Sequence, residues 1–589
     1  MTNKEIAQIL RNIAAAYTIK NEKKFIFQIL AYKKAADSID DLTIQLQDLN
    51  KQGKLENVAG VGPTIRSRLE ELFKTGNVKH FEDVTSGIPK PVFVLMNIPS
   101  FGPKKAFRLA DEFDLKDEKT AIDDVLKIAK KGGISGLPGF GQKSEKDIIR
   151  AIDEYKQGFG KTTRMVLPYA YDIASEILRY LRKSPYVKKA EALGSLRRMQ
   201  ATVGDIDLAV ASDKPKEVID HFTKYPFKER VIEKGPSTAS ILVSGGHQVD
   251  LMVQPIDRFG SLLQHFTGSK EHNVALREFA LKKGISLSER GFKKNNKSGQ
   301  IIKTFDSEEK FYNALGLDWI PPELREDTGE IEEAAKHSLP KIIDLSDIKG
   351  DFHLHSSFPI EPSHDLGADS IADMVSKAHE LGYEYMAFSE HNPSISRHTK
   401  QQILDLIKAR NDEIDAVQER YKNIKIFKGM ETDITPSGDL ALSNEALNLL
   451  DFAIVSIHSV FKTPKEEITK RVLSGLSHPK ARILAHPTGR LLNQRAGYEL
   501  DFDKVFDFVK KNNKAVEINA FPNRLDLTDS LVREAVKVGV EMVINTDSHK
   551  LLQMELMGYG VAMARRGWAT KKDILNTLPL SFFLDWLKK

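Results

Sequence analysis

Residues 193–210 read Leu-Gly-Ser-Leu-Arg-Arg-Met-Gln-Ala-Thr-Val-Gly-Asp-Ile-Asp-Leu-Ala-Val, which joins a glycine-serine turn to a strand that carries two acids. In Asp205-Ile206-Asp207 the alternation of a β-strand puts both carboxylates on one face and Ile206 on the other. A second predicted strand carries Asp250 between apolar residues. Three carboxylates on adjacent strands repel one another, so two Mg²⁺ ions are the economical explanation for this arrangement.

The turn that precedes these acids is suited to phosphate. Gly194 and Ser195 are expected to bind the phosphates of a nucleotide through backbone N–H groups and the hydroxyl, and Arg198 to pair with them. Two metals beside that site would activate an attacking hydroxyl and neutralise a leaving pyrophosphate. A lone Asp-x-Asp is usually a solvated strand edge, but the preceding Gly-Ser-x-Arg-Arg favours nucleotidyl transfer.

Three segments of the first 150 residues resemble one another at a period of roughly 40 residues. They read Val-Ala-Gly60-Val-Gly62-Pro, Ile-Pro-Ser100-Phe-Gly102-Pro and Leu-Pro-Gly139-Phe-Gly141-Gln, and each precedes a stretch with helical spacing. Glycines allow a close approach, and the following helix presents free N–H groups. Such turns suit DNA backbone phosphates, the pattern of the helix-hairpin-helix element. The alternative is three ordinary helix–turn–helix corners, with Ser100 making the middle copy the least typical.

The length, cysteine content and charge of the chain limit which classes of protein it can belong to. A chain of 589 residues is too long for one hydrophobic core, and the lack of cysteine excludes disulfides and thiolate zinc sites. Residues 1–320 hold 52 Lys+Arg against 41 Asp+Glu, a net charge of +11, whereas the remainder holds 35 against 41. A basic first half suggests nucleic acid as the partner. No signal peptide and no membrane-spanning run are expected.

Ten of the sixteen histidines lie beyond residue 350, and six of these stand in short motifs, several with carboxylates. The motifs are Asp351-Phe-His353-Leu-His355, Ser389-Glu390-His391, Gly429-Met-Glu431, Ser456-Ile-His458, Ala485-His486-Pro487 and Thr546-Asp547-Ser548-His549. Most follow an apolar β-rich run, which places their side chains at strand ends, where parallel α/β folds hold their chemistry. The sequence therefore predicts a multinuclear metal site.

The same region alternates predicted helices with predicted strands. Helices are expected over 370–381 and 402–420, and strands over 385–389 and 424–428. This repeated βα order implies a parallel, barrel-like sheet. His379, His398 and His478 have no motif partner and are expected at the surface.

These motifs carry a resemblance to a known family. Residues 194–207, Asp250 and Phe266-Thr-Gly268-Ser-Lys-Glu-His-Asn273-Val-Ala-Leu-Arg277 resemble the palm and thumb of family X DNA polymerases, the DNA polymerase β relatives. The motifs beyond residue 350 resemble a PHP (polymerase and histidinol phosphatase) domain. Their fusion in this order is similar to the bacterial family X polymerases and covers nearly the whole chain.

The resemblance implies a multidomain fold. It comprises an α-helical N-terminal helix-hairpin-helix domain, an α+β nucleotidyltransferase palm with fingers and thumb, and a C-terminal distorted (βα)7 PHP barrel. The implied divisions are 1–90 for the helical DNA-binding domain, 91–160 for fingers with two further hairpin elements, 161–257 for the palm, 258–327 for the thumb, 328–349 for a linker and 350–589 for the PHP domain.

The resemblance also implies roles for the polymerase residues. Asp205 and Asp207 would hold two Mg²⁺ or Mn²⁺ ions, and Asp250 the ion that activates the primer 3′-hydroxyl. The nucleotide would be contacted by Gly194, Ser195, Arg198, His265, Phe266, Gly268, Asn273 and Arg277. DNA would be bound by the hairpin glycines Gly60, Gly62, Gly102, Gly139 and Gly141.

Two positions depart from the family pattern. Arg68 stands where DNA polymerase β has the lysine that forms a Schiff base with an abasic sugar. A guanidinium stays protonated and is a poor nucleophile, so deoxyribose-phosphate lyase activity is not expected from this position. His265 stands where relatives have a tyrosine against the incoming sugar, which bears on the rejection of ribonucleotides.

In the PHP region the resemblance implies a site of two to three Mn²⁺, Zn²⁺ or Fe²⁺ ions. The implied ligands are His353, His355, His391, Glu431, His458, His486, Asp547 and His549. The ninth ligand is open: Asp365 is preferred, and Glu361 and His364 are its rivals. Glu390 replaces the usual aspartate before His391, a change that can alter how the imidazole is held.

The function implied is a DNA-directed DNA polymerase that fills short gaps in base excision repair. A metal-dependent 3′-5′ exonuclease, 3′-end-processing or abasic-site endonuclease activity would lie in the PHP domain. Expected partners are gapped or nicked double-stranded DNA and deoxynucleoside triphosphates, for a monomer at the nucleoid of a bacterial cytoplasm. One alternative is an end-processing phosphoesterase whose polymerase half only binds DNA. Another is a small-molecule phosphatase acting on a substrate such as histidinol phosphate.

Overall fold

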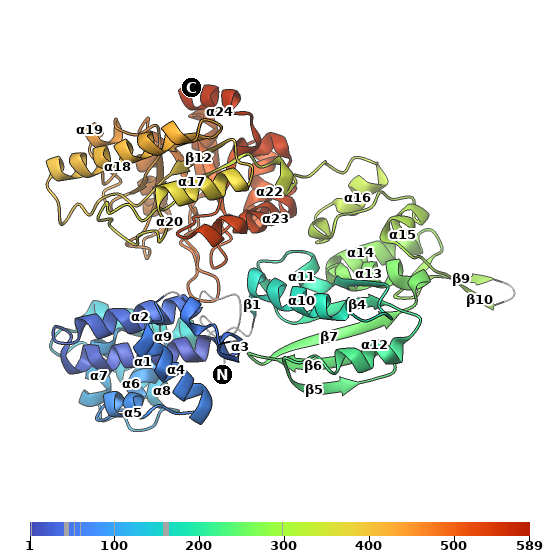
Figure 1. Cartoon of the computed structure of the whole chain (residues 1–589), viewed down its shortest axis with the longest axis horizontal. Coiled ribbons are helices and arrows are strands. Elements are labelled where there is room, and N and C mark those ends of the chain that lie inside the picture. The colour runs from blue at the N-terminus through green and yellow to red at the C-terminus, as the bar shows by residue number, and fades with distance from the viewer. Residues whose placement is uncertain are drawn as a thin grey trace. The chain divides into compact units, whose positions relative to one another are not determined.

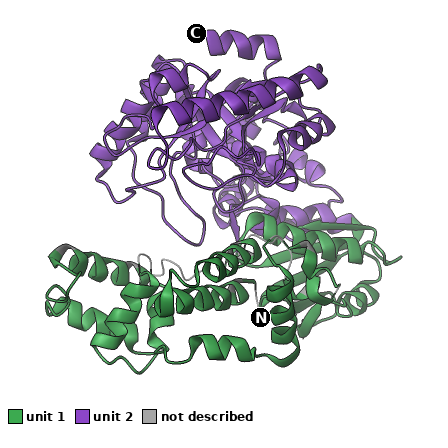
Figure 2. Cartoon of the chain, turned by 60° about the vertical axis from the view of Figure 1, so that its left-hand side comes forward, with its two compact units in different colours: residues 1–192, 204–256 green, residues 193–203, 257–589 purple. Residues whose placement is uncertain are grey.

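The computed structural model describes residues 1, 3–40, 46–51, 53–58, 60–98, 101–156, 164–296 and 299–589. It divides into two compact units, residues 1–192 with 204–256 and residues 193–203 with 257–589 (Figure 2). Ala59 of the first hairpin segment, and Pro99 and Ser100 of the middle one, lie outside the described residues.

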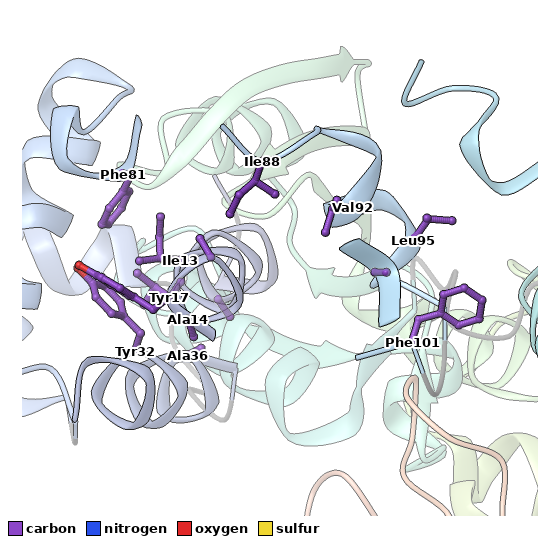
Figure 3. Packing of buried hydrophobic residues seen from close by; sticks show 14 of the residues in the cluster. Ile13, Ala14, Tyr17, Tyr32, Ala36, Phe81, Ile88, Val92, Leu95 and Phe101 are labelled. Carbon is purple, nitrogen blue, oxygen red and sulfur yellow. The ribbon is translucent and has the colours of Figure 1, made fainter. Parts of the chain in front are cut away.

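The N-terminal part of the first unit is helical (Figure 1). Its elements are α1 (Asn3–Asn21), α2 (Ile26–Asp40), α3 (Leu46–Lys51), η1 (Leu55–Asn57), α4 (Pro63–Thr75), α5 (Lys79–Thr85), α6 (Pro91–Leu95), α7 (Pro103–Glu112), α8 (Ala121–Lys130) and α9 (Gln142–Lys156). One hydrophobic cluster runs through these helices, with Tyr17 and Tyr32 stacked and Phe81 against Tyr32 (Figure 3). Burial of these side chains is the main stabilising term of the domain.

The described residues of the three hairpin segments share one hydrogen-bond pattern. In each segment a backbone hydrogen bond closes a tight turn. The N–H groups of Val61, Phe101 and Phe140 donate to the carbonyls of Val58, Ile98 and Leu137, three residues earlier. The helix that follows then begins at Pro63, Pro103 or Gln142. The repeat read from the sequence is therefore a structural repeat, and each copy presents the N-terminus of a helix.

The palm is a five-stranded sheet of order β2-β4-β7-β6-β5. Its region contains β1 (Met165–Val166), α10 (Leu167–Leu181), β2 (Lys189–Ala192), α11 (Gly194–Arg197), β3 (Thr202–Val203), β4 (Ile206–Ala211), α12 (Pro215–Phe222), β5 (Lys228–Lys234), β6 (Thr238–Val243) and β7 (His247–Gln254). Strands β4 and β7 are parallel neighbours, while the other pairs are antiparallel. Helices α10 and α12 pack against the sheet.

The thumb opens the longer segment of the second unit. It contains η2 (Ile256–Arg258), α13 (Phe259–Thr267), α14 (Lys270–Leu281), β8 (Ser286–Ser288), β9 (Gly291–Asn296), β10 (Gly299–Lys303), α15 (Glu308–Ala314) and η3 (Pro322–Leu324). The residues after it include α16 (Glu330–Ala335), whose Ile331 and Ala334 are buried in the thumb core. Trp568, far along the chain, is part of the same core.

The C-terminal barrel has parallel strands throughout. Its elements are η4 (Leu345–Asp347), β11 (Gly350–Leu354), α17 (Ile371–Glu380), β12 (Tyr385–Phe388), α18 (Lys400–Arg420), β13 (Lys425–Lys428), β14 (Glu431–Asp433), α19 (Asn444–Leu447), β15 (Ala453–Ser456), α20 (Lys465–Leu476), β16 (Ala481–Leu484), α21 (Phe502–Lys511), β17 (Ala515–Asn519), α22 (Asp529–Val538), β18 (Met542–Asn545), η5 (Leu551–Leu556), α23 (Met557–Arg566), η6 (Lys571–Asp573), η7 (Leu575–Thr577) and α24 (Leu580–Lys588). The predicted βα order is confirmed, with α17, β12, α18 and β13 lying where helices and strands were expected.

Two isolated bridges close this sheet. Leu354 pairs with Ser548 and His391 pairs with Glu431, both in parallel. Strands β13 and β14 are separated only by Gly429 and Met430, so they count as one interrupted strand in a ring of seven. The implied distorted (βα)7 barrel is thus the fold observed, and the multidomain fold class is confirmed. Among the described helices, none is both long and apolar enough to cross a membrane.

Candidate active sites

The acidic group of the palm forms across two parallel strands. Asp207 of β4 lies directly opposite Asp250 of β7, and Asp205 immediately precedes β4. Asp250 accepts hydrogen bonds from the Ser240 hydroxyl and from Gln248 Nε2, the latter at 2.9 Å. Burial, and then the charges of Asp205 and Asp250, raise the pKa of Asp207 to about 6. Asp207 therefore feels the charges of both other acids, as expected of a site for divalent cations.

Replacing Asp207 with asparagine is expected to stabilise the metal-free protein at pH 8 by roughly 1–2 kcal/mol. The pKa of Asp207 is higher in the folded protein than in the unfolded chain, so the folded state binds this proton more tightly. The parent protein therefore loses folding free energy as the pH rises through about 6 and the Asp207 carboxyl becomes charged. Asparagine carries no charge, so the advantage should vanish near pH 4. Thermal unfolding in a chelator at both pH values measures this, and a variant less stable than the parent at pH 8 would contradict it.

Several residues that were predicted to contact the nucleotide belong to the second unit. They lie around the C-terminal end of α13. Arg197 Nη1 donates to the Thr267 hydroxyl at 2.6 Å, and Arg198 Nη1 donates to the Thr267 carbonyl at 2.8 Å. Asn273 Nδ2 donates to the His265 carbonyl at 2.8 Å. Gly268 cannot carry a side chain, since a Cβ there would lie 2.8 Å from His272 and 2.9 Å from Asn273.

The other members of this set are more open. Phe266 is half-buried against the edge of the His265 ring, and Arg277 is exposed. Gly194 has a φ of +59°, a backbone conformation that favours glycine, and it begins α11 together with Ser195. The structure therefore brings Arg198, His265, Gly268 and Asn273 together within the second unit.

The hairpin glycines divide into two kinds. Gly60 and Gly139 have φ values of +77° and +82°. Gly62, Gly102 and Gly141 immediately precede the helices, and an added Cβ at any of the three would meet open space. Internal packing is therefore not what requires glycine at these three positions.

Arg68 lies on α4 inside the helical domain. Its Nη1 donates to the Tyr32 hydroxyl, and the guanidinium also lies 5.7 Å from the centre of the Tyr32 ring. Burial raises the pKa of Tyr32 to about 12. Arg68 is therefore engaged as a fixed cation, which agrees with its poor suitability as a nucleophile.

The histidine motifs of the barrel converge. Four groups each bring three ligand atoms within 4.8 Å of one another: His355 with His391 and His549, His353 with His355 and Glu431, His391 with Glu431 and His458, and His364 with Asp433 and His458. Among the described residues, all such groups lie in this domain, so the palm acids are more widely spaced. His486 Nε2 lies 2.9 Å from Glu431 Oε1, and Asp547 Oδ1 lies 3.2 Å from His355 Nε2.

The donor atoms of this cluster fit metal ions. His353 Nε2, both ring nitrogens of His355 and Glu431 Oε2 are buried and make no hydrogen bond. His353 Nε2 lies 3.2 Å from Glu431 Oε2, yet the two are not in hydrogen-bond geometry. Buried nitrogen and oxygen atoms without hydrogen-bond partners are costly unless an ion satisfies them. Apart from the ninth ligand, which was left open, all eight predicted ligands line this cluster.

Charge inside the cluster is strongly coupled. Burial and the neighbouring histidines lower the pKa of His355 to about 3. Burial also opposes the charge of His391, but Glu431 and Asp365 outweigh it and raise the pKa of His391 to about 10. Burial opposes the charge of Glu431, but the neighbouring His391, His458 and His353 outweigh it and hold the pKa of Glu431 well below its ordinary value.

The three candidates for the ninth ligand separate. Asp365 lies 3.1 Å from His391 Nε2 and 3.3 Å from His549 Nε2, at the rim of the cluster. His364 lies 3.1 Å from Asp433 instead, and Glu361 pairs with His398 at 3.0 Å. Asp365 thus contacts two predicted ligands directly and His364 lies in a group with the predicted ligand His458, whereas Glu361 is engaged elsewhere. The His398 side chain is 8% exposed, so its expected surface position is wrong, because Glu361 and the Ser394 carbonyl hold it.

Sequence reasoning missed the carboxylates that orient the ligands. Glu517 of β17 lies 2.7 Å from His353 Nδ1 and also accepts the His486 backbone N–H at 2.7 Å. Asp433 lies 2.7 Å from His458 Nδ1. A carboxylate within the apolar run Ala-Val-Glu-Ile-Asn was the signal available for Glu517. Such partners fix the ring orientation of metal-binding histidines.

Glu390 is not turned toward the imidazoles. Its Oε2 pairs with Arg410 Nη1 at 2.8 Å, and both side chains are almost fully buried. Its Oε1 accepts a hydrogen bond from the Ser356 hydroxyl. The longer side chain at this position is thus neutralised from α18, leaving His391 to be held by other carboxylates.

Comparison with known families divides the chain in the same order. The helix-hairpin-helix domain family matches residues 1–78, the DNA polymerase beta thumb family residues 262–326, and the PHP domain family residues 351–521. A DNA polymerase/3′-5′ exonuclease PolX of Bacillus subtilis is 34% identical over 591 aligned positions, covering 100% of both chains.

Two further relatives each match one part of the chain. DNA polymerase lambda of Rattus norvegicus is 21% identical over 55% of this chain and 56% of its own length. A probable phosphatase of Acetivibrio thermocellus is 29% identical over 31% of this chain and 73% of its own. The chain is 34% identical to a PolX protein over the full length of both, and it contains a DNA polymerase beta thumb and a PHP domain. It therefore belongs to the PolX family, the family X DNA polymerases that carry a PHP domain.

Proposed function

We propose that this protein is a DNA-directed DNA polymerase that fills short gaps during base excision repair and trims DNA 3′ ends with its PHP domain. The observation that carries the polymerase assignment is the register of Asp207 against Asp250 on parallel strands, with the charge of Asp205 also acting on Asp207. The PolX relative of Bacillus subtilis bears both activities in its name.

In the polymerase reaction the palm acids would hold Mg²⁺ or Mn²⁺. Such ions lower the pKa of the primer hydroxyl and neutralise the leaving pyrophosphate. Asp250, positioned by Ser240 and Gln248, would face the primer terminus. Arg198 would bind the triphosphate and Asn273 would lie along the minor-groove side of the new base pair, where base identity is least visible and shape is read.

In the nuclease reaction the barrel cluster would hold two or three ions of Mn²⁺, Zn²⁺ or Fe²⁺. These ions supply hydroxide near neutral pH and polarise a phosphodiester. Glu517 and Asp433 would keep His353 and His458 oriented toward the cluster. Asp365, at the exposed rim, would complete the set from the solvent side.

DNA binding would begin at the helical domain. The three hairpins present helix N-termini behind glycines with open space, and the first 320 residues carry a net charge of +11. Backbone phosphates fit such sites without base recognition, which suits a protein acting on gaps or nicks of any sequence. A single chain holds both sites, so a monomer is sufficient.

A one-nucleotide gapped duplex with a labelled primer tests the assignment. With Mg²⁺ or Mn²⁺ and the four triphosphates, the primer is expected to gain one nucleotide, and without triphosphates it is expected to shorten from its 3′ end. A protein that binds and shortens the primer but never extends it would instead be an end-processing phosphoesterase on a DNA-binding platform. Hydrolysis of histidinol phosphate without action on DNA would favour the small-molecule phosphatase.

A further inference from the structure

The last residue of α23 reaches from the PHP domain into the nucleotide-binding turn. Arg566 has a side chain only 2% exposed, and its Nη1 donates to the Arg198 carbonyl at 2.8 Å and to Glu326 Oε1 at 2.9 Å. Its Nη2 pairs with Asp529 of α22. Every one of these residues belongs to the second compact unit. Arg566 therefore links two PHP helices to the turn that ends at Arg198.

Glu326 is shared between two guanidinium groups. Its Oε1 accepts from Arg198 Nε at 2.8 Å and from Gln200 Nε2 at 2.7 Å, in addition to Arg566. The Arg198 side chain is 12% exposed and that of Glu326 22%, so the pair is only partly screened by water. Arg566 is itself divided between Glu326 and Asp529, so the two guanidiniums and two carboxylates balance, and Glu326 shares its single charge between Arg198 and Arg566.

We propose that Arg566 is a positioning residue for Arg198, through which the PHP domain sets how strongly the polymerase site binds a nucleoside triphosphate. This rests on the proposed function, in which Arg198 binds the triphosphate. A carboxylate divided between two guanidiniums holds each less tightly than one paired with a single guanidinium. With Arg566 in place, Arg198 can turn its free N–H groups to phosphate without leaving Glu326 unpaired.

Loss of Arg566 would act on Arg198 in two ways. Glu326 would be left to Arg198 and the neutral Gln200 amide, so the carboxylate would offset more of the Arg198 charge that is offered to the triphosphate. The Arg198 carbonyl would also lose its donor at the end of the turn, loosening the segment that positions the side chain. Both changes weaken nucleotide binding and leave the palm acids that carry the chemical step untouched.

The test uses the full chain with His353→Ala, so that primers are not shortened, and compares it with the same protein carrying Arg566→Ala. On a one-nucleotide gap, KM for the incoming triphosphate is expected to rise about tenfold with kcat within about twofold, the size of one charge-assisted contact. The Kd of a triphosphate for enzyme bound to a gapped, dideoxy-terminated primer should weaken by the same factor. An unchanged KM and Kd would overturn the proposal.

Two further variants separate positioning from general structural damage. Adding Glu326→Gln to Arg566→Ala should restore most of the lost affinity, since no carboxylate is left to compete for Arg198. Arg565→Ala removes the neighbouring ion pair to Glu323, 2.7 Å long, without touching Arg198, and should leave KM unchanged.

Each outcome of these variants decides something. A high KM that Glu326→Gln does not relieve, or an equal rise in Arg565→Ala, would reduce Arg566 to an interface residue and refute the proposal. If the Arg566-intact protein incorporates no nucleotide at all, the polymerase assignment fails first and this inference with it. Melting temperatures of all variants show whether the effects on KM track stability.

Discussion

Asp250→Ala should abolish gap filling, lowering single-nucleotide incorporation by at least roughly a thousandfold. The carboxylate stands opposite Asp207 on the adjacent parallel strand, where it would hold the ion that activates the primer hydroxyl. Its removal takes away a ligand but little packing, because the side chain is only half-buried. Single-turnover extension of a labelled primer with saturating triphosphate measures the loss.

A matched control lies a few residues from Asp207. Asp213 is an acid at the end of the same sheet, engaged by Lys188 on the surface, and Asp213→Ala should extend primers at the parental rate. Shortening of the primer from its 3′ end should continue in both variants, because it depends on the other domain. Extension by Asp250→Ala at the rate of the parent would remove the palm acids from the reaction.

His353→Ala is expected to have the second large effect, a loss of at least roughly a thousandfold in 3′-end degradation. His353 is completely buried among Glu431, Asp547 and Glu517, so nothing else can reach its position. The bound metal, measured by elemental analysis of the purified protein, should fall with the activity. Gap filling in the presence of Mg²⁺ should persist.

The appropriate control for this variant is another histidine of the same domain. His478 lies at the end of α20, beside Asn444 and away from the motifs, and His478→Ala should retain both metal and nuclease activity. Undiminished degradation by His353→Ala would show that the activity resides elsewhere or in a contaminating nuclease.

Much of this architecture was readable because its signals are local. The Asp-x-Asp pair, the glycine repeats and the histidine motifs each occupy a few consecutive residues whose spacing already implies a strand, a turn or a strand end. The barrel followed from alternating βα periods, and strands such as β12, β15 and β18 are completely buried, as is typical of parallel strands.

The contacts that could not be predicted join residues that are far apart in the sequence. Nothing near Glu326 indicates that Arg566, 240 positions away, will share its carboxylate with Arg198. Glu517 lies 164 positions from His353, and a single buried acid in an apolar strand has several explanations until the sheet is closed. Long-range pairing leaves no local periodicity, so these partners appear only in three dimensions.

The position of Trp568 in the thumb core bears on whether the polymerase part could evolve without the C-terminal domain. Its indole is 4% exposed and fills the interior of the thumb, although it follows the last strand of the barrel by more than twenty positions. A lineage discarding the nuclease would uncover the inside of its own polymerase, with a penalty of about 3–5 kcal/mol for an emptied tryptophan site. Losing the whole C-terminal domain, as opposed to losing its metal ligands, would therefore require a compensating change in the thumb.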